Sequence, residues 1–435
     1  MAKKFFVATF GCRTNQADSA AIRQAFLDQS FLEADDHRQA DVIVVNSCTV
    51  THRSDQQVRQ LARKMRRENP SAKIVLTGCY AQRSPEAAAR IEGLDFVVGN
   101  TFKGQIVEIA NSPVPAGVSE LAEVYRDDFR KVRAIDLTPA TQIGGKTRPF
   151  VKIQDGCDAC CSYCIIPQVR GPSRSVPPDL IYRQVEELIE HGFQEIVLTG
   201  IHIGTYGMHF QPRVPLDRLL ARLIKIPGLG QLRLSSIEPM ELSRRVIRLA
   251  AESERIAPHF HICLQSGSDS VLRRMLRPYD TARFASIVEE IRETIPDAGI
   301  GTDVIVGFPG ETDREFQETV EFVRRMPFTY LHVFPYSDRA GTAASRMRDK
   351  LNPSVIKQRS QILRELSEAK NREFRTSFVG RSLRLLTLTE EQNGYREAVT
   401  GNYLKARIDT SIPGNKILTG KVLTEEQGYL KLAAS

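Results

Sequence analysis

The densest group of reactive side chains in the sequence is a run of four cysteines between Cys157 and Cys164. Three of them, Cys157, Cys161 and Cys164, have the spacing C-x3-C-x2-C, with Tyr163 directly before the last one. Cys160 leaves a second set open, because Cys157, Cys160 and Cys164 have the same spacings in reverse order. Clustered cysteines in an intracellular chain indicate metal or redox chemistry, so we expect three thiolates here to hold a metal centre.

Two other uses of cysteine are less compatible with the sequence. A zinc knuckle normally takes four Cys or His ligands, whereas each of the two sets that this run offers supplies three thiols. Disulfides belong to oxidising compartments, whereas Met1-Ala2-Lys3-Lys4 lacks the apolar stretch of a secretion signal. We therefore expect a cytoplasmic protein, and we keep a zinc-holding, non-catalytic RNA-binding protein as the alternative of another class.

Apolar runs near the N-terminus alternate with segments of helical periodicity. The runs are predicted as strands at 3–10, 42–46, 73–77 and 96–98, and the helices at 17–29 and 55–68. This alternation predicts a parallel α/β sheet domain, placed at residues 1–113. Cys12, Cys48 and Cys79 directly follow its first three strands. Because ligands gather at the carboxyl ends of parallel strands, we predict that these cysteines share a second metal cluster.

A stretch rich in proline, glycine and charge, 114–148, is predicted as a linker, and a second α/β alternation follows at 149–375. Its predicted strands are 150–154, 195–199, 231–235, 259–264, 299–306 and 330–334. Six such units in about 200 residues predict an incomplete (β/α) barrel, whose functional loops follow the carboxyl ends of the strands. The run of cysteines comes directly after the first of these strands.

Polar residues stand at several of the other strand ends of this barrel. They are Thr199, Gly200, Ser235, Ser236, Gln265 and Asp303. Three histidines in the same strands and loops, His202, His259 and His261, are interpreted as hydrogen-bonded structure rather than metal ligands. Cys263 lies within an apolar strand and is predicted to belong to the core.

The last part of the chain, 376–435, changes to short alternating runs separated by turn signals such as Asn393-Gly394 and Pro413-Gly414. That pattern predicts a small all-β barrel. Basic and aromatic side chains could form an RNA-binding face on it, namely Tyr395, Arg396, Tyr403, Lys405 and Arg407. The net charge of +8 favours a polyanionic partner, and no apolar run approaches the roughly 20 residues of a membrane span.

The whole chain resembles the radical S-adenosylmethionine (SAM) methylthiotransferase family. Its N-terminal cysteine motifs are matched by Thr9-Phe10-Gly11-Cys12-Arg13-Thr14-Asn15-Gln16, Asn46-Ser47-Cys48-Thr49-Val50-Thr51 and Thr77-Gly78-Cys79-Tyr80-Ala81-Gln82. Its radical motif is matched by Asp155-Gly156-Cys157 through Cys164-Ile165-Ile166-Pro167 and then Arg170-Gly171. The resemblance implies an N-terminal methylthiotransferase domain, a partial (β/α)6 radical SAM barrel and a C-terminal TRAM domain. Cys160 departs from the family pattern.

The resemblance also implies cofactors and partners. Cys157, Cys161 and Cys164 would hold one 4Fe-4S cluster that binds SAM at an open iron, and Tyr163 favours Cys161 over Cys160 as the ligand. A second 4Fe-4S cluster would lie at Cys12, Cys48 and Cys79. SAM would be bound by Thr199, Gly200, Ser235, Ser236, Gln265 and Asp303. The expected partners are a tRNA anticodon loop and an electron donor such as flavodoxin or ferredoxin, with the protein a monomer.

Within the family, the N-terminal motifs favour the branch that acts on threonylcarbamoyladenosine in tRNA. The expected reaction adds a methylthio group to carbon 2 of that base, next to the anticodon. The alternatives are isopentenyladenosine in tRNA and an aspartate of a ribosomal protein.

Overall fold

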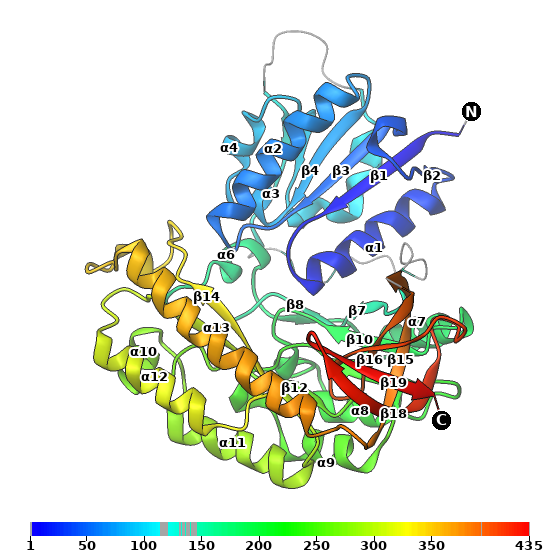
Figure 1. Cartoon of the computed structure of the whole chain (residues 1–435). Coiled ribbons are helices and arrows are strands. Elements are labelled where there is room, and N and C mark those ends of the chain that lie inside the picture. Colours follow the sequence, from blue (N-terminus) through cyan, green and yellow to red (C-terminus); the bar gives the residue numbers. More distant parts are fainter. Residues whose placement is uncertain are drawn as a thin grey trace.

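The structure is a computed structural model that describes residues 2–113, 121–129, 132, 135, 140, 146–392 and 394–434. Three parts follow one another along the chain and pack together (Figure 1): an N-terminal sheet with its helices, a central barrel and a C-terminal barrel. In the described ranges, no helix is long and apolar enough to cross a lipid bilayer.

The N-terminal sheet has six parallel strands in the order β2-β1-β3-β4-β5-β6. Its elements are β1 (Lys4–Thr9), α1 (Arg13–Asp28), β2 (Leu32–Glu33), β3 (Val42–Ser47), α2 (His52–Glu68), β4 (Lys73–Gly78), α3 (Cys79–Arg83), α4 (Pro85–Ala89), β5 (Phe96–Val98), α5 (Ile106–Asn111) and β6 (Glu123–Tyr125). Separate apolar cores cover the two faces, one with α2 and α4 and the other with α1 and α5. Burial on both faces explains why β3 and β4 are almost uninterrupted apolar runs.

Two short strands of this sheet, β2 and β6, were not predicted from the sequence. β6 lies within the stretch expected to be a linker, yet it pairs in parallel with β5 and extends the sheet. The other residues of 114–148 lie partly outside the described ranges. Three residues are too few to show the alternating pattern by which a strand is predicted from the sequence. Only the pairing with β5 identifies β6 as a strand.

The central barrel is built from two three-stranded parallel sheets, β7-β10-β11 and β12-β13-β14. Its elements are β7 (Phe150–Lys152), β8 (Gln154–Asp155), α6 (Ile166–Arg170), β9 (Arg174–Ser175), α7 (Pro178–Glu190), β10 (Glu195–Thr199), α8 (Leu216–Leu223), β11 (Gln231–Leu234), α9 (Arg244–Glu252), β12 (His259–His261), α10 (Asp269–Arg274), α11 (Thr281–Thr294), β13 (Gly299–Val306), α12 (Asp313–Arg325), β14 (Tyr330–Pro335) and α13 (Pro353–Thr376). A parallel bridge between Ile237 and Ile262 joins the sheets, so six strands form the expected incomplete (β/α) barrel.

An incomplete barrel has two edge strands, here β7 and β14. The edge at β7 is covered by α1 of the N-terminal sheet, which packs against this strand. Lys152 of β7 places its Nζ 2.5 Å from Asp18 Oδ1 of α1, inside this contact. Consequently, the helix that begins directly after Cys12 lies beside the barrel (Figure 1).

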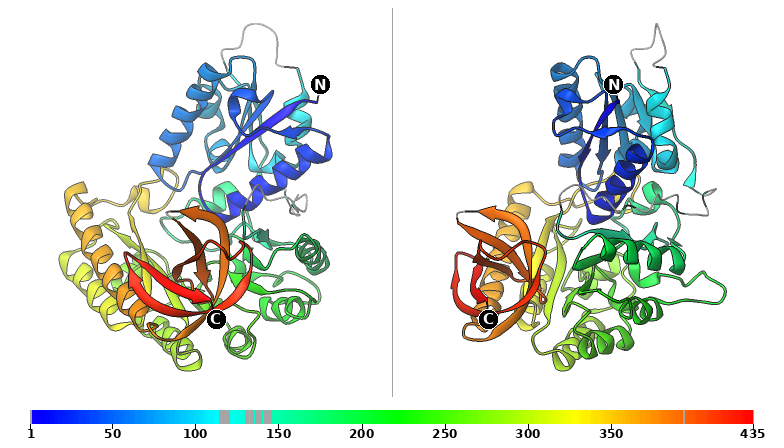
Figure 2. Two further views of the ribbon diagram at one scale, coloured as in Figure 1. Left: turned by 45° about the vertical axis from the view of Figure 1, so that its right-hand side comes forward. Right: turned by 90° about the vertical axis from the view of Figure 1, so that its right-hand side faces the viewer.

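The C-terminal barrel is closed, with strand order β15-β16-β17-β19-β18. Its strands are β15 (Ser382–Gln392), β16 (Tyr395–Thr400), β17 (Lys405–Asp409), β18 (Ile417–Glu426) and β19 (Tyr429–Ala434). It packs against the central barrel, in front of it in the left view of Figure 2 and at its side in the right view. Buried Arg233 of β11 donates to the carbonyl oxygens of Gly401, at 2.8 Å, and Thr400, at 3.2 Å, which fixes one turn of the small barrel. The predicted small all-β barrel is confirmed.

Candidate functional site: two three-cysteine sites at the junction of the sheet and the barrel

The three N-terminal cysteines lie at one edge of the sheet. Their strands β1, β3 and β4 are parallel neighbours, and each cysteine follows the carboxyl end of its strand. Cys12 is exposed at the N-terminus of α1, whereas Cys48 and Cys79 are buried. Burial and the neighbouring Cys79 raise the pKa of Cys48 to about 12. Such a thiol is readily deprotonated only when a metal binds it.

Two glycines set the geometry of these cysteine loops. Gly11 has φ +99°, and a Cβ atom on it would lie 2.6 Å from Cβ and 2.9 Å from Sγ of Cys48. Gly78 has φ +96°, and a Cβ atom there would lie 2.3 Å from the carbonyl oxygen of Ser47. Only glycine adopts these dihedrals without strain and leaves the space free. Therefore the glycines before Cys12 and Cys79 let their loops approach the loop of Cys48 closely.

Polar side chains near the N-terminal cysteines connect their loops to the central barrel. Asn15 Nδ2 donates to the carbonyl oxygens of Phe10, at 2.8 Å, and Ser47, at 2.9 Å. The amide oxygen of Asn15 accepts a hydrogen bond from Arg170, at the end of α6. Arg170 Nη1 also lies 2.9 Å from Asp18 Oδ2 and 3.1 Å from Asp155 Oδ2. One buried arginine of the barrel therefore reaches into the N-terminal cysteine site.

The other three cysteines, Cys157, Cys161 and Cys164, line a cavity of about 360 Å³ at the mouth of the central barrel. Cys160 is exposed on the same loop and does not line this cavity. Tyr163 lies on the cavity wall and packs against a small apolar cluster that contains Met275 and Phe308. Burial raises the pKa of Cys164 to about 12, as it does for Cys48.

Charged side chains contact two of these thiols directly. Arg277 Nη1 donates to Cys161 Sγ at 3.1 Å, and its other Nη donates to Glu238. His202 Nδ1 lies 3.4 Å from Cys157 Sγ, and its Nε2 lies 2.6 Å from Glu241 Oε2. Burial lowers the pKa of His202, but its contacts with Cys157 and Glu241 outweigh this effect and raise it to about 10. Two cationic groups therefore face a set of thiols that becomes anionic on binding metal.

The six residues predicted to bind SAM are only partly in this cavity. Gln265 and Asp303 line it, whereas Thr199, Gly200, Ser235 and Ser236 do not. Residues that follow them closely in the sequence, Ile201, His202 and Glu238, line the cavity instead. Ser235 is buried, and its hydroxyl has no hydrogen-bond partner among the described residues.

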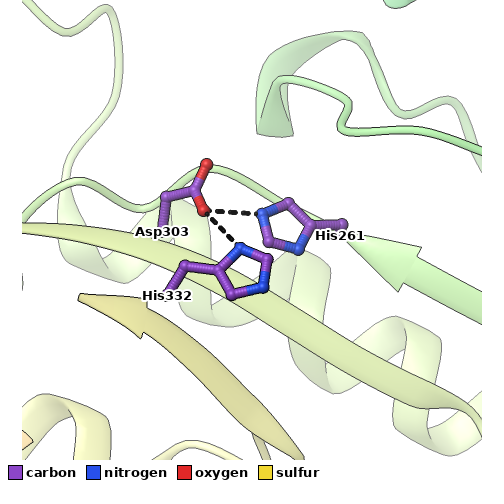
Figure 3. Close-up of side chains that lie close together, drawn as sticks. All are labelled: His261, Asp303 and His332. Carbon is purple, nitrogen blue, oxygen red and sulfur yellow. Dashed lines mark hydrogen bonds and ion pairs between the residues drawn. The ribbon is translucent and has the colours of Figure 1, made fainter. Parts of the chain in front are cut away.

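Asp303 also belongs to a group of side chains from three neighbouring strands (Figure 3). Its Oδ1 lies 2.9 Å from Nε2 of His261 and 3.2 Å from Nδ1 of His332. The ligand atoms of these three residues lie within 4.8 Å of one another. His261 is buried and also contacts the hydroxyl of Tyr330 at 3.0 Å. The carboxylate thus bridges two imidazoles, which agrees with the interpretation of His261 as hydrogen-bonded structure.

The loop after Cys48 brings the two cysteine sites together. Val50 and Thr51 of this loop line the cavity that holds Cys157, Cys161 and Cys164. Arg339, in the loop after β14, is buried and donates to the carbonyl oxygens of Thr49 and Val50. Its Nη1 also donates to Asp55 Oδ2 at 3.0 Å. This contact holds the N-terminal loop at the cavity rim.

Several residues of the site were missed by sequence reasoning. Arg170 lies in a motif that was recognised, but nothing in the sequence indicated its partners. Arg277 and Arg339 stand more than one hundred residues from the six motif cysteines, and no local pattern distinguishes them from other arginines. Their contacts with Cys161 and with the Cys48 loop are produced only by the packing of distant segments.

The donor sets suit iron-sulfur clusters. Each site supplies three sulfur donors, and thiolates are the ligands that hold 4Fe-4S clusters in proteins. Three protein ligands for four irons leave one iron for a small molecule. The residues present therefore match the cofactors that the cysteine motifs imply.

Comparison with known proteins assigns the family. Residues 4–99 match the model described as Uncharacterized protein family UPF0004, and residues 151–323 match the Radical SAM superfamily. A threonylcarbamoyladenosine tRNA methylthiotransferase MtaB from Aquifex aeolicus is 40% identical, covering 91% of this chain and 94% of the relative. The protein of the same name from Bacillus subtilis is 37% identical, covering 95% of this chain and 91% of the relative. This chain belongs to the radical SAM methylthiotransferase family.

Among solved structures, the radical SAM methyltransferase TsrM from Kitasatospora setae is similar in fold. It has a TM-score of 0.56 at 14% identity and covers 77% of this chain and 73% of that one. The family and the fold class expected from the sequence are confirmed, and with them an enzyme that uses SAM and 4Fe-4S clusters. The individual ligands and SAM-binding residues stay predictions.

Proposed function

We propose that this protein is a tRNA-modifying enzyme that methylthiolates carbon 2 of threonylcarbamoyladenosine next to the anticodon. The observation that carries the proposal is that the loop of one three-cysteine site reaches the cavity of the other: Val50 and Thr51, which follow Cys48, lie on the wall that also holds Cys157, Cys161 and Cys164. The choice of nucleoside is supported by relatives of that name, which match more than nine tenths of this chain.

In this proposal, Cys157, Cys161 and Cys164 hold the 4Fe-4S cluster that binds SAM, and Cys12, Cys48 and Cys79 hold the second cluster. Bound there, the cofactors supply hydrogen abstraction from an unactivated carbon and the transferred sulfur, which no acid or base among the side chains provides. The unpartnered hydroxyl of Ser235 and the position of Gln265 and Asp303 on the cavity wall support the predicted SAM contacts. Like Ser235, the residues Thr199, Gly200 and Ser236 do not line the cavity, and they stand close in sequence to its wall residues Ile201 and Glu238.

The protein's own residues orient the ligands and exclude water. Arg277 and His202 hydrogen-bond to Cys161 and Cys157 and so fix the orientation of those sulfur atoms. The apolar side chains of Val50 and Phe334 line the cavity that holds Cys157, Cys161 and Cys164, and both are exposed there. Once a bound substrate covers them, such side chains would limit access of water to reactive species.

The proposal extends to partners and organisation. We propose that the anticodon loop of tRNA is the substrate, that flavodoxin or ferredoxin supplies electrons, and that the enzyme acts as a cytoplasmic monomer. The proposed domains are 1–113, 149–375 and 376–435, joined at 114–148. A base in a single-stranded loop is accessible because it can be splayed out of its stack.

The decisive experiment is nucleoside mass spectrometry of total tRNA from a strain that lacks this gene. We expect 2-methylthio-threonylcarbamoyladenosine to disappear and to return when wild-type protein is supplied. It should not return with Cys12→Ala or Cys161→Ala, whereas Cys160→Ala should restore it, because Cys160 lies outside the cavity.

Two other outcomes would change the assignment. Loss of the isopentenyl derivative instead would keep the chemistry and move the protein to the other tRNA branch. If no methylthio nucleoside changes and no redundant enzyme is present, the tRNA assignment is wrong and a ribosomal-protein aspartate becomes the substrate to test.

A further inference from the structure

Arg13 lies where all three parts of the chain meet. It is the first residue of α1, directly after Cys12. Its Nη2 donates to the hydroxyl of Tyr403 in the C-terminal barrel, at 2.9 Å. The ring of Tyr403 stacks on His259 of the central barrel, with 4.4 Å between ring centroids. The guanidinium is therefore positioned by residues from two other parts of the chain.

The turn that presents Tyr403 is held in an unusual conformation. Tyr403 has φ +72°, a region that residues with a side chain rarely adopt. The turn is retained by Arg233, which bonds the carbonyl oxygens of Thr400 and Gly401. Below it, His259 Nε2 lies 2.8 Å from the hydroxyl of Tyr330. The Tyr403 hydroxyl is thus part of a rigid wall of aromatic and imidazole rings.

The charge of Arg13 is unpaired within the described part of the chain. Among the described residues, no carboxylate lies within ion-pair distance of its guanidinium. The nearby cation Arg233 is different, because its Nε is paired with Glu195 at 2.8 Å. Arg13 is half-buried, where a charge interacts more strongly with a ligand than it would in open solvent. The local field next to Cys12 is therefore positive and suited to an anion.

We propose that Arg13 binds the carboxylate of the threonylcarbamoyl group on the target adenosine and so selects this nucleoside. The inference rests on the proposed function, because it concerns the substrate of the same site. A guanidinium pairs with a carboxylate through two parallel hydrogen bonds, whereas an isopentenyl group offers neither charge nor acceptor. Since Arg13 directly follows Cys12, an anion bound to it would hold the base beside the N-terminal cysteine site.

The test compares the binding of two anticodon stem-loop RNAs, one with threonylcarbamoyladenosine and one with unmodified adenosine. Dissociation constants are measured anaerobically with the iron-loaded enzyme, for wild type, Arg13→Gln and Arg13→Lys. We expect Arg13→Gln to weaken binding of the modified RNA about 10- to 100-fold, and binding of the unmodified RNA less than about twofold. Arg13→Lys keeps the positive charge but loses the planar guanidinium that pairs with a carboxylate through two hydrogen bonds. Its affinity for the modified RNA should therefore lie between those of wild type and Arg13→Gln.

Arg38→Gln is the matched control. Arg38 lies in the same part of the chain and pairs with Asp36 at 2.6 Å, with its side chain 63% exposed. We expect it to bind both RNAs as wild type does. Iron content and the visible absorbance of the clusters are recorded for every variant, so that loss of a cluster is not mistaken for loss of a contact.

Three results would overturn the inference. An equal loss for both RNAs, with the salt dependence of log Kd reduced by about one unit, would mean that Arg13 contacts a phosphate. Unchanged binding of the modified RNA by Arg13→Gln would remove any role in recognition. Wild-type protein that binds both RNAs equally would also contradict it, even where nucleoside analysis upholds the function. Failure of the proposed function is seen separately, as absence of the methylthiolated product with wild-type enzyme.

Discussion

At the scale of single residues, the N-terminal cysteine site depends on a glycine, because a side chain at that position would collide with Cys48. Gly11 leaves open the space beside Cys48 that any other side chain would fill, since a Cβ atom there would come within 2.9 Å of the thiol. The same residue needs a positive φ, so two independent constraints select glycine. Gly192 has a similar φ of +88° but nothing within 4 Å of its Cβ position. It therefore shares the backbone constraint of Gly11 without the steric one.

We predict that Gly11→Ala removes the N-terminal cluster, whereas Gly192→Ala does not. Both substitutions add a Cβ at a positive φ and share a backbone cost of about 1–2 kcal/mol. Only the Cβ at position 11 enters the space of Cys48, so Gly11→Ala should lose about half of the iron of the loaded protein. Iron and sulfide analysis after anaerobic reconstitution measures this difference. Equal iron content in the two variants would contradict the steric explanation.

At the scale of elements, the short helix α6 connects the two cysteine sites. It begins two residues after Cys164, and Ile165 and Val169 pack against Cys79. The carbonyl oxygen of Val169 accepts a hydrogen bond from Asn100 at 2.8 Å. The helix ends at Arg170, which is 1% exposed and lies between Asp18 and Asp155. A helix of five residues is not stable alone, so these contacts determine its place.

The ion pairs of Arg170 are expected to stabilise the junction strongly. Burial raises the pKa of Asp155, but Arg170 and Lys152 outweigh this effect and lower it to about 2, so the carboxylate is charged at neutral pH. Arg170→Gln leaves two buried carboxylates with less compensation, which costs about 3–5 kcal/mol. We predict a clearly lower midpoint of thermal unfolding for this variant.

Arg222→Gln is the comparison for that measurement. Arg222 pairs with Asp179 at 2.6 Å, but both side chains are largely exposed to solvent. An exposed pair contributes less than about 1 kcal/mol, so the midpoint should hardly change. Equal midpoints of thermal unfolding for the two variants would contradict the prediction that burial makes the ion pairs of Arg170 contribute more to stability.

At the scale of the whole molecule, the positive charge and the C-terminal barrel together suggest where RNA binds. Lys405, Arg407 and Lys431 lie on one face of β17 and β19 and contact aromatic rings: Arg407 lies 3.9 Å from the ring centroid of Tyr429, and Lys431 lies 5.6 Å from that of Tyr395. Two residues expected on this face are elsewhere. Arg396 is buried and bonds the carbonyl oxygen of Ile412, and Tyr403 turns toward His259 and Arg13.

We predict that this face contributes to tRNA affinity through its charge. The triple variant Lys405→Gln, Arg407→Gln and Lys431→Gln should reduce the dependence of log Kd on log salt by about two to three units. The control removes the same charge from the outer helix α12, with Arg314→Gln, Arg324→Gln and Arg325→Gln, all exposed. Salt titrations of tRNA binding compare the two. An equal effect of both triples would mean that net charge matters and that this face does not.

The sequence by itself determined which residues carry chemistry and in what kind of element they lie. The C-x3-C-x2-C run and the three strand-end cysteines are local patterns, and alternating strands and helices are set by local periodicity. The strands at 195–199 and 299–306 were therefore predicted with the bounds that the structure gives them. Errors were largest where local signals are weak. Helix α1 begins at Arg13, whereas the sequence predicted a start at residue 17. The start was misplaced because the N-cap residue, Cys12, makes no side-chain capping hydrogen bond and so gives no capping signal.

Only the tertiary structure decided that the loop after Cys48 reaches the cavity of Cys157, Cys161 and Cys164, and which charged groups surround the two cysteine sites. Arg170 reaches Asn15, Arg277 reaches Cys161, and Arg339 reaches the loop after Cys48, over separations of more than one hundred residues in each case. The contacts of Arg170 and Arg339 depend on how the N-terminal sheet packs on the central barrel, and that of Arg277 depends on the fold of the central barrel itself. The physical reason is that a buried charge acquires its partners by packing, which no short stretch of sequence encodes.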